Sequence, residues 1–471
     1  MRFGSVVSGA VAAVLLLGSL GCGSDDGLAV GAGASDGSSN SSAPQVPSPT
    51  SAVAGGEGGS DGTSSANATP GVGGGDFTSS AGSGVPEACL GEDFLTDLGK
   101  DHVMVGARLD EPLAATTPLD LRYTHLTGLL PDGEGPCESC ATGCVTDGMS
   151  CSSEEPGGCD WWGCWPSDDD VPGAYLRDFA ATARERGQIP MVTYSMVVSS
   201  SGADEGVAEI VAMNDAAYLR RYLSDFRFVL QSLGEGPALV QVEPGFWGYV
   251  QQLDPNPYAT PAAVPEANPE ECGDEEPSIA GLGRCLVKMA RLHAPDAKIG
   301  LHGSGWSTAI DVLQNDDTSV DVVAEATALG AFLSATAPDA DLVFIDATDR
   351  DAGYSASIGR ETWWDDTNMT LPNFHQAFDW SRTLSETMAR PHLWWQLPFG
   401  NMSLPGGSTQ WTDNRLDYFF SHMGEVAAAH GVGIAFGAGA GGQVTAESDG
   451  GNFASKASDY ADAGGQPLCL E

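Results

Sequence analysis

The stretch Ala238-Leu-Val-Gln-Val-Glu243-Pro-Gly-Phe-Trp247-Gly-Tyr249 is the most informative part of the sequence. Its first five residues form a mostly apolar run, as expected for a parallel strand that is covered on both faces. The run stops at a carboxylate, a proline and a glycine, and aromatic residues follow. This order is typical of the C-terminal strand ends of a (β/α)8 barrel, where the active sites of that fold lie. The alternative is a solvated acid that opens an ordinary loop.

Other short apolar runs, bounded by Gly, Pro or Asp, have the character of this strand. Together they predict strands at 102–108, 120–126, 190–196, 238–243, 297–302, 341–346, 392–396 and 431–436. The alternation with helical segments predicts right-handed βαβ units and a parallel sheet. We therefore expect an α/β fold, a (β/α)8 TIM-type barrel. Only residues 109–119 separate the first two strands, so the first helix is expected to be degenerate. A doubly wound open sheet is the alternative.

The intervening helices are predicted from apolar residues at helical spacing. Asn214 is the expected N-cap of a helix whose apolar face runs from Tyr218 to Leu233. A second helix begins at Ser278 and is expected to bury Leu282, Leu286, Met289 and Leu292. Further helices are expected at 175–187, 320–335, 374–388 and 416–426.

The first 84 residues are not expected to join the barrel. Residues 1–21 carry an early Arg and an apolar run at 11–17 that is too short for a membrane span, which predicts a signal peptide. Residues 22–84 are rich in Gly, Ser and Ala and cannot bury a core, which predicts a disordered linker. Residues 85–471 then form one barrel domain, which we expect to act as a monomer.

The end of the signal segment, Ser19-Leu-Gly-Cys22, resembles a bacterial lipobox. This resemblance implies that Cys22 is lipidated and that the exported protein is anchored to a bacterial membrane, at the cell surface or on the periplasmic face. Ordinary cleavage nearby is the alternative. The linker would hold the barrel away from the membrane.

The charge of the chain is strongly negative, with 20 Lys and Arg against 64 Asp and Glu and a formal net charge of −44. Such a surface repels nucleic acid, so no nucleic-acid partner is expected. It suits an extracellular protein that acts on a neutral or cationic substrate. Solubility in salty or acidic surroundings is an alternative reason for this charge.

The 11 cysteines become an even number when Cys22 is set aside, as expected for an exported protein with disulfides. Cys89 and Cys469 flank the domain and are placed to join its ends, and Cys272 and Cys285 lie close in sequence. The remaining cysteines fall in an insertion at 127–171, after the second strand, and allow about 15 connectivities. They are Cys137, Cys140, Cys144, Cys151, Cys159 and Cys164.

The same insertion raises two further expectations. The spacing Cys137-x-x-Cys140 resembles a metal knuckle, but oxidation is the simpler fate after export, so no metal is assigned. The insertion follows the C-terminal end of a strand and carries Trp161, Trp162 and Trp165. We therefore expect it to overhang the active face.

Residues at the C-terminal strand ends of a barrel converge on one mouth. Glycosidic hydrolysis requires two carboxylates, and the predicted catalytic pair is Glu243 and Asp346, with Asp349 as the substitute. Aromatic rings that stack on sugars and polar groups that bind hydroxyls are the other expected components. The predicted substrate-binding residues are Arg108, His125, Tyr194, Trp247, Tyr249, His302, Trp306, Trp395 and Gln396. No serine-hydrolase, P-loop or His-Glu-x-x-His motif is present, and no cofactor is expected.

An exported barrel with many tryptophans and acids at its strand ends resembles the secreted bacterial glycoside hydrolases. Val242-Glu243-Pro244 looks like the Asn-Glu-Pro of strand four in the large retaining clan, which implies an acid/base role for Glu243. The chain has Val242 in place of that Asn, and Gln396 where the clan has a nucleophilic Glu on strand seven. The resemblance implies an enzyme that cleaves a polysaccharide. Gln396 favours an inverting mechanism or the alternative, a non-catalytic carbohydrate-binding lipoprotein on an inactive barrel.

Overall fold

The computed structural model describes residues 89–133, 135–142, 145, 161–167, 169–348 and 350–469. The predicted signal peptide, the lipidation site Cys22 and the linker lie outside the described residues. So do Cys144, Cys151, Cys159 and the substitute acid Asp349. Within the described ranges, no helix is both long enough and apolar enough to span a membrane.

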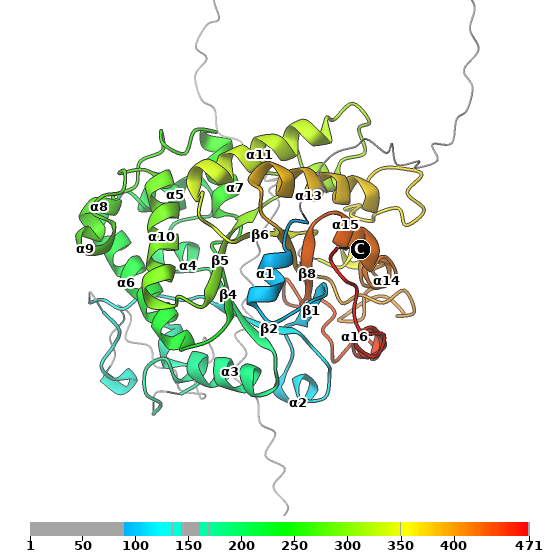
Figure 1. Cartoon of the computed structure of the whole chain (residues 1–471), viewed down its shortest axis with the longest axis horizontal. Helices are drawn as coiled ribbons and strands as arrows, with labels where there is room; N and C mark the ends of the chain where they lie inside the picture. Colours follow the sequence, from blue (N-terminus) through cyan, green and yellow to red (C-terminus); the bar gives the residue numbers. More distant parts are fainter. Residues whose placement is uncertain are drawn as a thin grey trace, which may run out of the picture. The chain divides into compact units, whose positions relative to one another are not determined.

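The strands are all parallel and pair in sequence order into a closed barrel. Figure 1 shows them at the centre, with the helices around them. The (β/α)8 prediction is confirmed, and the open sheet is excluded. The strands are β1 (Met104–Ala107), β2 (Leu121–Leu126), β3 (Ile189–Tyr194), β4 (Ala238–Val242), β5 (Ala297–Gly303), β6 (Leu342–Asp346), β7 (His392–Leu397) and β8 (Gly431–Phe436).

The helices follow the predicted alternation, and only the four-residue α2 lies between β1 and β2. The α-helices are α1 (Glu92–Asp97), α2 (Glu111–Ala114), α3 (Ala174–Glu185), α4 (Val197–Ser201), α5 (Val207–Ala212), α6 (Ala216–Leu233), α7 (Phe246–Leu253), α8 (Val264–Ala267), α9 (Pro269–Cys272), α10 (Ile279–His293), α11 (Val322–Thr336), α12 (Ala352–Ser357), α13 (Phe374–Met388), α14 (Arg415–Ser421), α15 (Met423–Ala428) and α16 (Asn452–Asp462). The short 3-10 helices are η1 (Cys140–Thr142), η2 (Trp162–Cys164) and η3 (Val312–Gln314).

Three helix predictions need correction. Asp215, not Asn214, caps α6, because its carboxylate accepts hydrogen bonds from the backbone N–H groups of Ala217 at 2.8 Å and Tyr218 at 3.2 Å. Leu292 is 57% exposed, since it lies to one side of the buried line of α10. The helix predicted at 416–426 is two helices, α14 and α15, which meet at His422.

The alternation of side chains along β2 fixes which residues face the barrel interior. The guanidinium of Arg122 lies over the ring of Phe179, and the hydroxyl of Thr124 is 2.6 Å from that of Tyr175. Both partners belong to α3, so Arg122 and Thr124 face the helix layer. Because successive side chains in a strand point to opposite faces, Tyr123 and His125 face inward.

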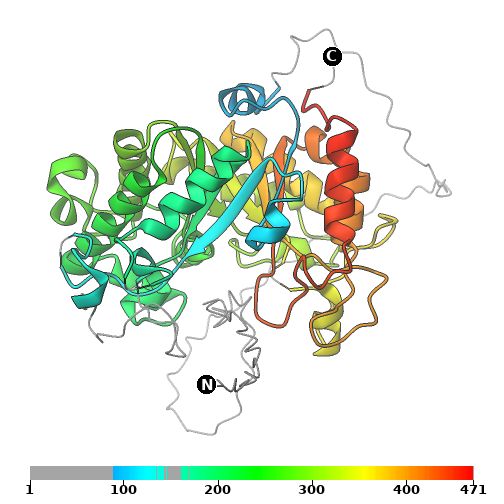
Figure 2. The ribbon, with the colours of Figure 1, turned by 90° about the horizontal axis from the view of Figure 1, so that it is seen from below.

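The described disulfides agree with two of the predicted pairings. Cys89 bonds to Cys469, and Figure 2 shows α1 and the C-terminal end of the chain side by side. Cys272 bonds to Cys285, which ties α9 to α10. In the insertion, Cys140 bonds to Cys164 and is therefore not free to bind a metal.

Two tryptophans of the insertion, Trp161 and Trp162, pack on the helix layer instead of overhanging the mouth. The indole N–H groups of Trp161 and Trp162 donate to the buried carboxylate of Asp225 on α6, at 2.6 and 3.0 Å. Both rings also lie within 6 Å of the Phe228 ring, at 5.7 and 5.4 Å between centroids. The expectation of an overhang is wrong for these tryptophans, because a buried acid on α6 pairs with their polar edges.

Candidate active site

Four consecutive strands contribute a continuous hydrogen-bonded chain inside the barrel. The hydroxyl of Thr193 (β3) donates to Gln241 Oε1 (β4) at 2.7 Å, and Gln241 Nε2 lies 2.9 Å from His302 Nδ1 (β5). His302 Nε2 then lies 2.9 Å from Asp346 Oδ1 at the end of β6. Gln241 and His302 are buried, whereas the side chain of Asp346 is 26% exposed. The chain of bonds therefore ends on a carboxylate that solvent reaches.

The direction of these bonds fixes the tautomer of His302. Gln241 Oε1 accepts from Thr193, so the amide nitrogen of Gln241 is the atom that donates to His302 Nδ1. His302 Nε2 consequently carries the proton and donates it to Asp346. The network holds Asp346 as a hydrogen-bond acceptor in one orientation.

A second carboxyl, Asp311, lies at the same end of the barrel in the loop after β5. Its carboxylate accepts a hydrogen bond from the backbone N–H of Leu313 at 3.2 Å. Burial, together with the nearby negative charge of Asp346, raises the pKa of Asp311 to about 6. Two acids with different surroundings, one held as an acceptor and one favoured in its protonated form, are the usual arrangement for acid–base chemistry.

An aromatic cluster fills the interior beside this network. The ring of Trp395 (β7) lies 5.5 Å from that of His125, 5.6 Å from that of His302 and 6.4 Å from that of Tyr123. Alternation places Trp395 inside, because its neighbour Trp394 packs on Phe419 in the helix layer.

Three polar atoms of this cluster are buried without a hydrogen-bond partner among the described residues: Tyr123 Oη, His125 Nε2 and Trp395 Nε1. Burial, and then the positive charge of Arg108, lower the pKa of His125 to about 3, so its imidazole is neutral. The Tyr123 hydroxyl lies against Gly437, where a Cβ would come within 1.7 Å of it. The glycine-rich segment at 437–442 thus begins with a close approach of its backbone to Tyr123.

Glu243 is turned away from this cluster. Alternation along β4 would place it on the inner face with Gln241, but its φ of 47° breaks the alternation. Its Oε1 accepts from the N–H of Met196 at 2.9 Å and its Oε2 from that of Val197 at 3.4 Å, at the start of α4. The side chain is only 4% exposed. The contacts of Glu243 are therefore with the β3–α4 segment, whereas those of Asp346 are with β5.

The surroundings of Glu243 favour its protonated form. Burial raises the pKa of Glu243 to about 8, and the charge of Glu209 on α5 acts in the same direction. Glu209 is itself buried, and its pKa is raised to about 7. These two acids form a second pair with raised pKa values, enclosed between the strand ends and the helix layer.

The other predicted substrate-binding residues divide into two groups. Trp247 is fully buried and donates its indole N–H to the carbonyl of Val242 at 2.9 Å, so its ring offers no face to a sugar. Tyr194 faces the helix layer, where its hydroxyl donates to Asp225 at 2.8 Å. Tyr249 and Trp306 are partly exposed and lie together, 4.6 Å between ring centroids.

Gln396 follows the inward-facing Trp395 and is 5% exposed, with a φ of 57°. Positive φ at a residue that is not glycine costs about 1–3 kcal/mol and occurs often at functional sites. Glu243 and Gln396 share this conformation at the ends of β4 and β7.

The sequence analysis missed Tyr123, Thr193, Gln241 and Asp311. Gln241 could have been predicted as part of a buried polar network, because a polar side chain in an otherwise apolar strand needs a buried hydrogen-bond partner. Asp311 carried none, since it lies in a loop that contains other acids.

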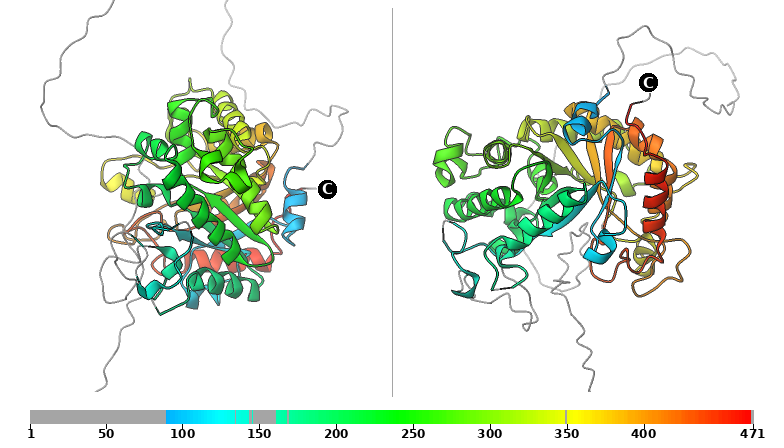
Figure 3. Two further views of the ribbon diagram at one scale, coloured as in Figure 1. Left: turned by 90° about the vertical axis from the view of Figure 1, so that its left-hand side faces the viewer. Right: turned by 60° about the horizontal axis from the view of Figure 1, so that its bottom comes forward.

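A further acid beyond β6, Asp351, joins the loops after β6, β7 and β8, which lie together at one end of the barrel (Figures 2 and 3). Its Oδ2 accepts from the N–H of Val444 at 2.8 Å, and its own N–H donates to Gln443 at 2.9 Å. Asp413 accepts from the N–H of Ala352 at 2.7 Å. Burial and the charge of Asp413 raise the pKa of Asp351 to about 8. These contacts join the loops after β6, β7 and β8, so Asp351 has a structural role at the mouth of the barrel.

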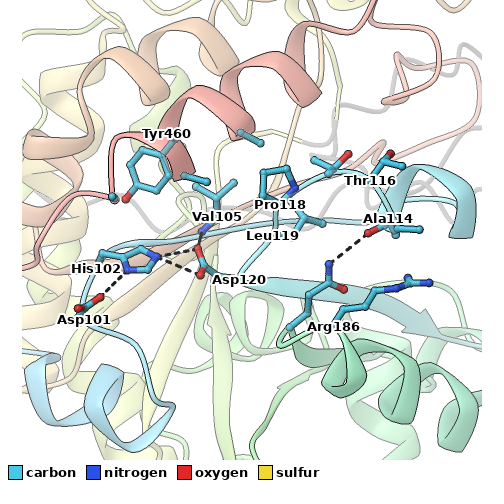
Figure 4. A pocket seen from close by; sticks show the side chains of 17 residues that line it. Asp101, His102, Val105, Ala114, Thr116, Pro118, Leu119, Asp120, Arg186 and Tyr460 are labelled. Carbon is cyan, nitrogen blue, oxygen red and sulfur yellow. Dashed lines mark hydrogen bonds and ion pairs between the residues drawn. The ribbon is translucent and has the colours of Figure 1, made fainter.

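A cavity of 670 Å³ lies at the opposite end of the barrel, where the strands begin. Figure 4 shows His102 in this cavity, between the carboxylates of Asp101 and Asp120. Asp120 also accepts from Lys100 at 2.7 Å and from the N–H of Val105 at 3.0 Å. These polar groups pair with one another, as expected at the end of a barrel that supports stability.

The described residues contain one group of side chains with metal-ligand spacing, Cys89, Glu92 and Cys469. Its two cysteines form a disulfide, which leaves a single glutamate as a ligand. No metal site is assigned there.

No protein-family model matches the chain, and no curated protein matches it either. Among solved structures, a modular endo-β-1,4-mannanase from Cellulomonas fimi is similar at 11% identity and a TM-score of 0.43, over 79% of this chain and 74% of that one. A family 5 mannosidase from Rhizomucor miehei is similar at 9% identity and a TM-score of 0.35, over 69% of this chain and 73% of that one. These values carry no inference about activity, and the barrel itself is established by the strand pairing.

Proposed function

We propose that this chain is an extracytoplasmic glycoside hydrolase that cleaves a polysaccharide, with Asp346 as the base or nucleophile and Asp311 as the proton donor. The observation that carries the proposal is the pair of carboxyls at the barrel mouth in different surroundings. His302 holds Asp346 as an acceptor, and burial beside Asp346 raises the pKa of Asp311 to about 6. Glycosidic cleavage requires one carboxyl that donates a proton and a second that acts as a base or nucleophile.

The exposure of the two side chains favours Asp311 over Glu243 as the proton donor. A general acid must come within hydrogen-bond distance of the glycosidic oxygen. Asp311 is partly exposed, whereas Glu243 is 4% exposed and both its oxygens face backbone N–H groups. Glu243 is the second candidate, because a pKa of about 8 keeps it protonated at neutral pH.

The partly exposed pair of Tyr249 and Trp306 supports a sugar as the substrate. Trp306 and Asp311 lie in the same loop after β5, and the N–H of Val312 donates to the carbonyl of Gly305 at 3.0 Å, which brings the residues next to them together. Aromatic faces pack on the apolar faces of pyranose rings. The disulfides support an extracytoplasmic location. Anchoring through a lipid on Cys22 is part of the proposal and rests on the sequence.

The test is a screen of plant, fungal and bacterial polysaccharides with detection of new reducing ends. Wild type is compared with Asp346→Asn, Asp311→Asn and Glu243→Gln. The matched control is Asp316→Asn, an exposed acid near Asp311 on the same loop. We expect loss of about 10²–10⁴-fold in turnover for Asp346→Asn and Asp311→Asn, and little change for the control.

The variants that lose activity identify which acid is the proton donor. If Glu243→Gln is inactive and Asp311→Asn is active, Glu243 is the donor. If wild type binds a glycan and never cleaves it, the enzyme proposal fails, and the non-catalytic carbohydrate-binding protein takes its place.

A further inference from the structure

Arg108 is an exposed arginine at the mouth of the barrel in this acidic chain. It follows β1 directly. Within the described part of the chain, its guanidinium forms no ion pair and no hydrogen bond. Arg122, by contrast, pairs with Glu111, and Arg227 pairs with Glu271. In a chain with 64 acidic residues and 20 basic ones, an arginine without a carboxylate partner at the mouth is available to a ligand.

The groups beside Arg108 are also without partners. Tyr123 and Trp395 are 1% and 5% exposed, and neither Tyr123 Oη nor Trp395 Nε1 has a hydrogen-bond partner among the described residues. Trp395 Nε1 can only donate, and a tyrosine hydroxyl donates readily. His125 Nε2 is buried and unpartnered as well. A buried polar atom without a partner costs about 1–3 kcal/mol, so each of these groups gains from a ligand that pairs with it.

These groups lie on or directly after β1, β2 and β7, and the register of β6 and β7 pairs Asp346 directly with Trp395. The register of β1 and β2 pairs Ala107 with Arg122, so Arg108 lies beside Tyr123. The N–H of Arg108 also donates to the carbonyl of Phe436 at 3.0 Å, next to the Gly437 that the Tyr123 hydroxyl contacts. Trp395 then contacts His302, whose Nε2 donates to Asp346. The mouth therefore combines an exposed positive charge at Arg108 with three buried polar atoms that lack partners among the described residues, and this set reaches the carboxylate of Asp346 through Trp395.

From this arrangement we infer that Arg108, with Tyr123, His125 and Trp395, forms a subsite for the carboxylate of a uronic acid, so that the substrate is an acidic polysaccharide. A carboxylate offers acceptors only, and it matches the planar donor pattern of a guanidinium. The sugar assignment rests on the proposed function, and the carboxylate assignment rests on the donor set.

This inference revises the expectation from the net charge, which favoured a neutral or cationic substrate. The charge of −44 belongs to the whole chain and acts over distances that salt screens, with a Debye length of about 8 Å at physiological ionic strength. A local arginine next to buried donors acts at hydrogen-bond distance, where screening is weak. Recognition is then set by the subsite, and the overall charge slows the approach of the polymer.

Binding is measured by calorimetry with Asp346→Asn, so that the ligand is not cleaved. The probes are polygalacturonate, methyl-esterified polygalacturonate, which lacks the charge, and a neutral galactan. We expect polygalacturonate to bind at least tenfold more tightly than the other two polymers. Arg108→Gln in the same background should weaken this binding by about ten- to a hundredfold. Arg360→Gln is the matched control, because Arg360 is also exposed and also forms no ion pair among the described residues.

Tyr123→Phe is a second variant that separates binding from folding. It removes a hydroxyl that has no partner in the described structure, so the melting temperature should not fall. Binding of polygalacturonate should weaken by about two- to tenfold. Unchanged binding of polygalacturonate would count against Tyr123 as part of the subsite.

The outcomes separate this inference from the proposed function. Equal binding of the charged, esterified and neutral polymers, or equal effects of the two arginine variants, overturns the inference. Competition by acetate as strong as that by galacturonate also overturns it, because the site would then lack specificity for a sugar. Cleavage of a neutral polymer without preference for uronates overturns the inference and leaves the proposed function standing. If wild type binds polygalacturonate and never cleaves it, the subsite is supported and the proposed hydrolase activity is contradicted.

Discussion

The dependence of stability on pH offers a sharp test of the environment of Glu243. Its pKa is raised from 4.5 in a solvated side chain to about 8 in the folded protein, chiefly by burial. The folded state therefore binds this proton more tightly than the unfolded state does. The resulting contribution to the free energy of unfolding is fully present below about pH 4.5 and is lost as the pH rises through about 8.

The magnitude follows from the same values. One pKa unit corresponds to 1.36 kcal/mol, so ionisation of Glu243 would lower the free energy of unfolding by an amount on the order of 5 kcal/mol between pH 4.5 and pH 9. Glu243→Gln removes this titration. At pH 5 the variant should be about 1 kcal/mol less stable than wild type, because its amide cannot accept from both Met196 and Val197. At pH 9 the variant should be the more stable protein.

The assay is urea denaturation followed by tryptophan fluorescence at intervals from pH 5 to pH 9. The free energies of unfolding of wild type and Glu243→Gln should cross within this range. The control is Asp316→Asn, an exposed acid with no contact to Glu243, whose curve should run parallel to that of wild type. Parallel curves for wild type and Glu243→Gln would refute the reasoning, since Glu243 would then be ionised without cost in the folded state.

Further expected outcomes concern the network, the insertion and the tether. Asp225→Ala should lower the free energy of unfolding by about 1–3 kcal/mol for each buried donor that it leaves unpaired, such as Trp161 Nε1, in the same assay; a total loss below about 1 kcal/mol contradicts this. The ratio kcat/KM should fall about tenfold per pH unit above pH 6, as Asp311 loses its proton, and Asp311→Asn should lack this limb. Gln241→Leu should lower kcat more than it raises KM, since it frees the His302 ring next to Asp346; an unchanged kcat would show that the network does not position the carboxylate. Cys22→Ala should move the protein from the membrane fraction to the soluble fraction, and unchanged fractionation contradicts lipidation.

The fold could be predicted because its signal is local and repeated. Each strand is a short apolar run, and the spacing between runs leaves room for a helix everywhere except between β1 and β2. The boundary at Asp215 was missed because Asn214 and Asp215 are both good N-caps, and only the backbone bonds to Ala217 and Tyr218 choose between them.

The site could be predicted only in part, because the direction of a side chain depends on the backbone at the strand end. His302 and Asp346 lie where alternation places them. Glu243 does not, since a φ of 47° turns its carboxylate toward α4. Trp247 was assigned to the substrate from its place after a strand, but nothing in the sequence revealed that its indole N–H bonds to the carbonyl of Val242. Asp311 gains its importance from burial and from the charge of Asp346 at the end of β6, and no local pattern in the sequence encodes this combination.

The most direct test of the central claim follows the reaction of the purified protein with acidic polysaccharides by proton NMR. The proposal that Asp346 and Asp311 cleave a glycosidic bond predicts new reducing-end anomeric signals with wild type, and none above background over the same time with Asp346→Asn. Signals that grow equally fast with both proteins, or that appear with neither protein while the polysaccharide still binds, would contradict the proposed function.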